Sequence, residues 1–218
     1  MKTLLIMRHG KSSWKHKDLD DHERPLAKRG LRDSRMIGEV VHEKELVPQT
    51  ILVSSAVRTT QTAQIFCESS GYQGEITSLD DLYLAESDVY IAELKKLPDS
   101  IERVMVVGHN PGLEYLLQEL SGRIESLTTG VLAFVSLSID HWVDLDSKDS
   151  GELIELWRPK ELRDDIEEER EDKEKLKEKE KTKDKDKEKE KEKEKDKEKV
   201  KEKDKKEKAR PKRTAKKK

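Results

Sequence analysis

The stretch that decides the fold is Thr3-Leu4-Leu5-Ile6-Met7-Arg8-His9-Gly10-Lys11-Ser12-Ser13. Its first five residues are mostly apolar and rich in branched aliphatic side chains, which is typical of a strand buried on both faces of a parallel sheet. The apolar run ends at Arg8, too early for the hydrophobic region of a signal peptide. Ligands of open α/β sheets bind beyond the carboxyl ends of strands, so the residues after Met7 stand where a ligand site is expected.

The rest of the chain continues this pattern. Two further apolar runs, Thr50–Ser54 and Arg103–Val107, predict strands of the same kind. Helical patterns are found at Lys28–Lys44, Arg58–Ser69, Asp88–Leu97 and Gly112–Leu120. Two later strands, joined as a hairpin at one sheet edge, are expected at Val131–Ile139 and Glu152–Trp157. The alternation predicts an α/β fold, a single domain with three α/β/α layers around a mostly parallel central sheet.

The 218 residues divide into two parts of different composition. Residues 161–218 hold 27 of the 46 basic and 22 of the 48 acidic side chains, which leaves 19 basic and 26 acidic in residues 1–160. The first part therefore carries a formal charge of −7 and the second +5. We predict a folded domain in residues 1–160 and a highly charged, Lys/Glu-rich C-terminal tail in residues 161–218. The tail has too few apolar side chains to offset its ordering entropy, so it is expected to be disordered or a solvated helix.

The end of the tail differs from the rest of it. Lys173–Lys208 alternates Lys with Glu or Asp, whereas Lys208–Lys218 is basic and contains no acidic residue. Such a cluster can bind nucleic acid or another polyanion, can serve as a nuclear address, or can be a solubilising end without a specific partner. These alternatives stay open at the level of the sequence.

Several classes of protein are excluded by composition. No run of about 18 apolar residues is present, so no membrane span is predicted. Cys67 is the single cysteine, which excludes an internal disulfide and a cysteine-based zinc site. The expected location is the cytoplasm.

Cationic and titratable residues gather at the predicted ends of three strands. Arg8 and His9 follow the first, Arg58 stands in the first turn of the helix after the second, and His109 follows the third, between Gly108 and Gly112. An arginine fork suits phosphate oxygens, and a histidine can act as nucleophile or base. Each residue alone is commonly structural. Together they predict one cationic site suited to a phosphoryl group and short of metal ligands.

These motifs resemble those of the histidine phosphatase (phosphoglycerate mutase-like) superfamily, and most of all its small branch, the SixA-type phosphohistidine phosphatases. The resemblance covers about residues 1–158 and rests on Arg8-His9-Gly10, Arg24–Gly30, Val53–Ala63, Val107–Pro111 and Thr128–Gly130.

The resemblance implies a mechanism. His9 would attack phosphorus and become transiently phosphorylated, while Arg8, Arg58 and His109 would hold the equatorial oxygens. The arginines and an imidazolium would supply the positive charge, so neither a metal ion nor a cofactor is expected. Further candidates for contacts with the substrate are Gly10, Ser12, Arg24 and Asn110.

The general acid of larger superfamily members has no clear counterpart. The corresponding stretch, Leu79–Leu97, contains Asp80, Asp81, Glu86 and Asp88, none in a matching context. SixA-type enzymes are thought to manage without a strong acid, because imidazole leaves more easily than an alkoxide. The prediction is therefore a metal-independent phosphatase acting on protein phosphohistidine, with a histidine-containing phosphotransfer protein as partner.

Two alternatives remain. A phosphomonoesterase acting on a small metabolite would be favoured by a carboxylate that projects into the pocket from residues 79–97. A non-catalytic phosphate-binding protein, whose tail recruits a polyanion, is the other.

Overall fold

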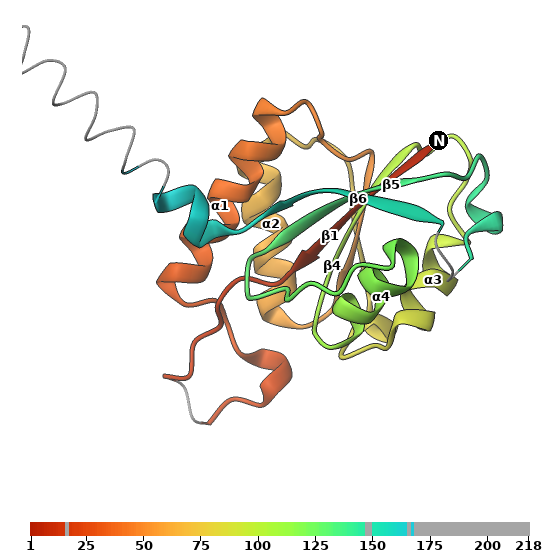
Figure 1. Ribbon diagram of the computed structural model, residues 1–218. Coiled ribbons are helices and arrows are strands. Elements are labelled where there is room, and N and C mark those ends of the chain that lie inside the picture. The colour runs from red at the N-terminus through yellow and green to blue at the C-terminus, as the bar shows by residue number, and fades with distance from the viewer. Residues whose placement is uncertain (16–17, 147–149, 165–166, 168–218) are drawn as a thin grey trace, which may run out of the picture. The chain divides into compact units, whose positions relative to one another are not determined.

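A six-stranded sheet forms the centre of the computed structural model (Figure 1). Its strands lie in the order β3-β2-β4-β1-β5-β6. In chain order they are β1 Lys2–Arg8, β2 Thr50–Ser54, β3 Ile76–Leu79, β4 Arg103–Gly108, β5 Leu132–Leu137 and β6 Gly151–Trp157. The pairs from β3 through β2 and β4 to β1 are parallel, and β5 is antiparallel to both β1 and β6. The sheet is therefore mostly parallel, and β5 alone of these six strands runs against the others.

Helices cover both faces of the sheet. Figure 1 shows α1 (Lys28–Glu43) and α2 (Val57–Ser70) together on one side, and α3 (Ser87–Leu94) with α4 (Gly112–Ser121) on the other. Successive side chains of a strand point to opposite faces, and β1 supplies both cores in this way. Leu4 and Ile6 are buried with the leucines of α4, whereas Leu5 and Met7 are buried with α1 and α2. The predicted α/β architecture with helices on both faces is confirmed.

The structure describes residues 1–15, 18–146, 150–164 and 167. Met1–Arg163 form one compact unit. The predictions made for the alternating stretch 173–208 and the basic end 208–218 lie outside the described residues. Among those described, no helix combines the length and the apolar content that a membrane crossing needs.

The predicted elements lie at the expected positions, with differences at their ends. β3 is the strand that the sequence analysis did not identify. It has only four residues, Ile-Thr-Ser-Leu, of which the middle two are exposed. A short edge strand of this kind leaves neither an apolar run nor a strict alternation in the sequence. β5 is shorter than the strand predicted at 131–139, and β6 begins one residue before the strand predicted at 152–157. The two strands form the expected antiparallel pair.

The sheet order brings the carboxyl ends of three strands together. β4 lies between β1 and β2, with Arg8 opposite Gly108 and Val53 opposite Val107. The segments that follow these three strands therefore leave the sheet at the same edge. This edge is where the candidate site lies.

Candidate active site

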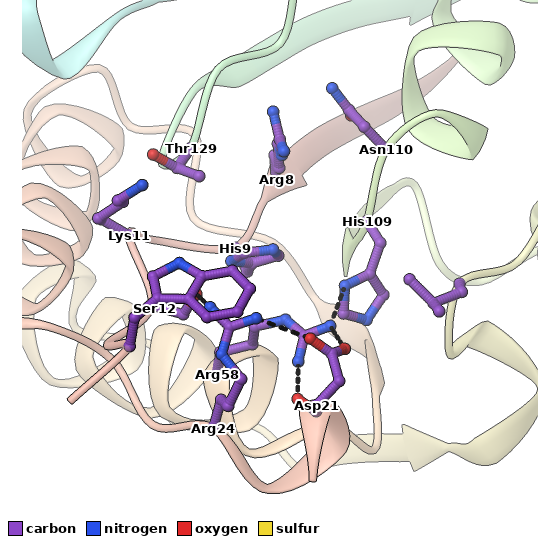
Figure 2. A pocket seen from close by; sticks show the side chains of 12 residues that line it. Arg8, His9, Lys11, Ser12, Asp21, Arg24, Arg58, His109, Asn110 and Thr129 are labelled. Carbon is purple, nitrogen blue, oxygen red and sulfur yellow. Dashed lines mark hydrogen bonds and ion pairs between the residues drawn. The ribbon is translucent and has the colours of Figure 1, made fainter. Parts of the chain in front are cut away.

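A cavity of about 270 Å³ opens at the carboxyl ends of β1, β2 and β4. Figure 2 shows side chains from separate elements converging on it. Its lining consists of Arg8, His9, Lys11, Ser12, Trp14, Asp21, Arg24, Arg58, Leu84, His109, Asn110 and Thr129. The residues predicted from three strand ends are thus brought together in one place.

His9 follows the last residue of β1 and is 8% exposed. Its Nδ1 lies 2.7 Å from the carbonyl oxygen of Gly10. A carbonyl oxygen can only accept a hydrogen bond, so Nδ1 carries the proton and Nε2 keeps its lone pair. Burial, together with the nearby guanidinium charges of Arg58 and Arg8, lowers the pKa of His9 to about 4 against the opposing effect of the Gly10 hydrogen bond. The ring is therefore an uncharged nucleophile at neutral pH.

The loop after His9 is held by unusually close backbone contacts with the start of α1. A Cβ on Gly30 would lie 2.4 Å from the Lys11 carbonyl oxygen, and one on Gly10 would lie 2.9 Å from the Gly30 carbonyl oxygen. The Ala27 amide donates to the Lys11 carbonyl, and Thr62 accepts from the Gly10 amide. Glycine at both places permits this approach, which explains the glycine that ends the Arg24–Gly30 motif.

Arg8 and Asn110 share one backbone acceptor. The Arg8 Nη1 and Asn110 Nδ2 atoms donate to the Leu127 carbonyl oxygen at 2.8 and 2.9 Å. Within the described part of the chain, Arg8 Nε and Asn110 Oδ1 are buried without a hydrogen-bond partner. Buried polar atoms are normally paired, so these two stand out beside a cavity that both side chains line.

Arg58 and His109 line the buried part of the cavity, on the side opposite Arg8 and Asn110 (Figure 2). Arg58 stands in the first turn of α2 and is 3% exposed. One of its terminal nitrogens lies 3.4 Å from His109 Nδ1, and His109 Nε2 lies 2.8 Å from Ser54 Oγ. A guanidinium only donates, so Nδ1 accepts and Nε2 carries the proton. Burial, followed by the charge of Arg58, lowers the pKa of His109 to about 3.

This pKa corrects one expectation from the sequence. An imidazolium was expected to add positive charge, but both His9 and His109 are uncharged here at neutral pH. The reason is that burial, and after it the guanidinium charges of Arg58 and Arg8, disfavour a further cation. The positive charge of the cavity comes from Arg8, Arg24, Arg58 and Lys11.

Arg24 and Asp21 build the outer part of the cavity. Arg24 donates to Ser12 Oγ and to an Asp21 carboxylate oxygen, both at 2.7 Å. Its guanidinium carbon lies 3.3 Å from the ring centroid of Trp14, in a cation–π contact. The other Asp21 oxygen is 2.9 Å from Arg58 and also accepts a hydrogen bond from Tyr83 (Figure 2 shows the Asp21–Arg58 contacts).

The Asp21 carboxylate is stabilised in its ionised form. Partial burial acts to raise its pKa, but the hydrogen bond from Tyr83, the charge of Arg58 and the hydrogen bonds from Arg24 and Arg58 outweigh burial and lower the pKa. Asp21 is therefore an anion at neutral pH and not a proton donor.

Most of the predicted site residues line the cavity. Arg8, His9, Arg58, His109, Ser12, Arg24 and Asn110 all do so. Gly10, predicted to contact substrate, does not, because its role is to let the loop approach α1. None of the five acidic residues of the 79–97 stretch, all of which the structure describes, lines the cavity either: Asp80, Asp81, Glu86, Asp88 and Glu93.

Among the residues of the site, Asp21, Tyr83 and Leu84 were not identified from the sequence. Asp21 lies among several charged residues, and its position three residues before Arg24 was the one available signal. Tyr83 contacts His109 edge to face, with ring centroids 5.5 Å apart. Its neighbour Leu84 has a φ of 51° and is 54% exposed. Strained backbone at an exposed apolar residue is a structural signal that a sequence does not carry.

The donor set does not form a metal centre in the described residues. No group of three His, Cys, Asp or Glu side chains in that part of the chain is placed to hold an ion. What the cavity can do is bind an oxyanion between guanidiniums and present to it the free Nε2 of an uncharged imidazole. That combination is suited to phosphoryl transfer.

Comparisons with known proteins agree with this chemistry. The profile of the Histidine phosphatase superfamily (branch 1) matches residues 4–88. An uncharacterized protein of Mycobacterium tuberculosis (strain ATCC 25618 / H37Rv) is 30% identical over 151 residues, which are 64% of this chain and 92% of the relative.

Two solved structures are similar to the chain in fold. A putative phosphohistidine phosphatase SixA from Nakamurella multipartitia has a TM-score of 0.65 and 25% identity, over 72% of this chain and 96% of its own. The protein histidine phosphatase SixA complexed with tungstate has a TM-score of 0.64 and 25% identity, over 73% of this chain and 99% of its own.

Proposed function

The chain belongs to the histidine phosphatase superfamily and is a phosphatase of the SixA type, and we propose that it removes phosphate from protein phosphohistidine without a metal ion. In this proposal His9 is the nucleophile, and Arg8, Arg58 and His109 bind the phosphoryl group. A histidine-containing phosphotransfer protein is the substrate.

In the first step His9 Nε2 attacks phosphorus. The substrate's phosphorylated imidazole carries a proton on its other ring nitrogen. A bond from His9 Nε2 to phosphorus forms as the bond to the substrate's imidazole nitrogen breaks, and the electron pair leaves with that nitrogen, so the substrate's imidazole departs uncharged. Because Nδ1 keeps its proton, the phosphorylated ring of His9 is positively charged, and the Gly10 carbonyl accepting from Nδ1 stabilises it. Arg8 and Arg58 stabilise the charge on the equatorial oxygens.

In the second step water attacks the phosphorylated His9. The phosphorus–Nε2 bond breaks, its electron pair returns to Nε2, and dihydrogen phosphate leaves. His9 is then again uncharged with its proton on Nδ1. No group of the chain needs to gain or lose a proton overall.

One observation carries the choice of substrate: no cavity-lining carboxyl group is placed and protonated to act as a general acid. Among the described residues Asp21 is the one carboxylate lining the cavity, and its lowered pKa keeps it ionised. An alkoxide leaving group needs a proton from such an acid, whereas imidazole is a much better leaving group. The site therefore favours a phosphoramidate over a phosphomonoester.

The test is turnover of two substrates in the presence of a chelator. Turnover of a phosphohistidine-bearing phosphotransfer domain and of glycerol 3-phosphate, an alkyl monoester with an alkoxide leaving group, would be measured for the wild type and for His9→Ala. We expect chelator-resistant turnover of the phosphohistidine, reduced about 10⁴-fold or more in His9→Ala. His141→Ala is a suitable control, because His141 is exposed and pairs with Asp99 away from the cavity.

Other outcomes would contradict the proposal in distinct ways. A preference for the monoester would mean that Asp21 or another group supplies a proton. Loss of activity with chelator would contradict metal independence. Full activity of His9→Ala would remove His9 as the nucleophile.

A further inference from the structure

Asp21 covers the fork of Arg58. The Asp21 carbonyl oxygen accepts a hydrogen bond from Arg58 Nη1, and a carboxylate oxygen of the same residue lies 2.9 Å from Nη2. The two oxygens of Asp21 thus bind the two terminal nitrogens of the guanidinium. Arginine binds a carboxylate or a phosphate in the same bidentate way. Asp21 thus occupies the edge of Arg58 that is best suited to an oxyanion.

Asp21 also bridges two cations of the cavity. Its second carboxylate oxygen lies 2.7 Å from Arg24 Nη1, so one carboxylate is shared between Arg24 and Arg58. Both arginines line the cavity into which the phosphoryl group must come. Of the five N–H groups of Arg58, two donate to Asp21 and one is directed to His109, so an oxyanion that binds Arg58 through both terminal nitrogens competes with Asp21 for them.

The segment that carries Asp21 is not part of the core. Asp21–Glu23 form the short turn η1, in which no residue is buried, and the Asp21 side chain is 48% exposed. The Arg58 side chain, by contrast, is 4% exposed and held within α2. When an anion competes with Asp21 for Arg58, the movable partner is therefore Asp21.

We propose that the Asp21 carboxylate is an internal competitor of the phosphoryl group, which sets the affinity of the site for oxyanions and leaves Arg58 when one binds. Asp21 then acts as a specificity-determining residue. A phosphoryl dianion carries more charge than a carboxylate and can displace it, whereas a singly charged carboxylate ligand gains no such advantage. After hydrolysis the carboxylate returns to Arg58 and promotes release of phosphate.

The test measures binding of inorganic phosphate by titration calorimetry at pH 7.5. Asp21→Asn keeps the backbone carbonyl and the size of the side chain but removes the charge. We expect the Kd for phosphate to fall about tenfold, which corresponds to about 1.4 kcal/mol. In turnover assays the same variant should show stronger product inhibition by phosphate.

Asp20→Asn is the matched control. It removes the same charge one residue earlier, from an exposed side chain that does not line the cavity. If Asp20→Asn lowered the Kd for phosphate as much as Asp21→Asn does, the effect would come from the net charge around the cavity, and the proposal would be overturned. Unchanged or weaker phosphate binding by Asp21→Asn would also overturn it, and weaker binding would assign Asp21 to holding Arg58 in place.

A second variant tests the same contact without altering charge. Tyr83→Phe removes the hydrogen bond that Tyr83 donates to the Asp21 carboxylate. The carboxylate should then be easier to displace, and phosphate should bind about twofold to threefold more tightly; no tightening would contradict the proposal. Phosphate binding requires no turnover, so these results do not depend on phosphohistidine being the substrate.

Discussion

The deep and outer parts of the cavity are built in different ways. The deep part, here called the floor, consists of Arg8, His9, Arg58 and His109. The outer part, here called the wall, consists of Ser12, Trp14, Asp21, Arg24 and Leu84. Floor residues lie at the ends of parallel strands: Arg8 is the last residue of β1, and the other three come directly or closely after a strand. Wall residues belong to the segment between β1 and α1 and to the loop after the short 3₁₀ turn η2 (Asp80–Leu82).

The difference lies in what fixes each part. The parallel register of β1, β4 and β2 brings the floor residues together through backbone hydrogen bonds and two buried cores. The wall is held by side-chain contacts, above all the hydrogen bonds of Arg24 and Asp21. We therefore expect floor substitutions to change catalysis strongly, and wall substitutions to change which ligands bind.

The largest effect in this comparison is expected for Arg58→Ala. The variant loses the buried guanidinium that contacts His109 and that, in the proposed mechanism, binds the phosphoryl group, so kcat for phosphohistidine should fall about 10²- to 10³-fold. Single-turnover and steady-state assays on the same phosphotransfer domain would measure it. Arg35→Ala, at an exposed position paired with Glu68, is the control and should retain kcat.

A small change in kcat for Arg58→Ala would break the distinction between floor and wall. Circular dichroism would show whether the variant is folded, so that a loss of structure is not taken for a loss of catalysis.

The next effect is a dependence of stability on pH that arises in the floor. The pKa values of His9 and His109 are about 4 and about 3 in the folded protein, against 6.5 for an unperturbed histidine. Between pH 7 and pH 5 the unfolded chain binds protons that the native state does not, so the free energy of unfolding decreases as pH falls. Each imidazole should account for about 2 kcal/mol of this loss by pH 5.

Urea unfolding at pH 7 and pH 5 would measure this loss. His109→Gln cannot titrate, so its loss between the two pH values should be smaller than that of the wild type by about 2 kcal/mol. An equal loss in both proteins would mean that His109 is not kept uncharged by its surroundings.

The contrast between floor and wall also explains what the sequence could predict. Apolar runs of four or five residues located β1, β2 and β4, because strands buried on both faces must be apolar throughout. β3 was missed because its exposed middle residues give no such run. Arg8, Arg58 and His109 were predicted correctly as neighbours, because parallel strands end at a common edge.

Ser12 and Arg24 of the wall were predicted from the sequence, whereas Asp21 and Leu84 required information that the sequence does not hold. The contact of Asp21 with Arg58 spans 37 positions and depends on the path of a loop, for which no periodicity exists. The uncharged state of His109 depends on burial and on the closeness of Arg58, neither of which its neighbours in the sequence indicate. The predicted imidazolium was wrong for this reason.

The smallest effect, and the one that separates protein from small-molecule substrates, is expected at the wall. Trp14 is 70% and Leu84 54% exposed, and both line the cavity. A protein carrying phosphohistidine would cover this apolar surface on docking, whereas a small phosphoramidate such as phosphoimidazole would not. Trp14→Ala should therefore raise KM about threefold for the phosphotransfer domain and leave kcat unchanged. For phosphoimidazole neither constant should change.

Val143→Ala, at a 65% exposed residue beside Trp142 and away from the cavity, should affect neither substrate. An equal rise in KM for both substrates would mean that Trp14 acts through Arg24, on which its ring stacks, and that the wall belongs to the phosphate site itself.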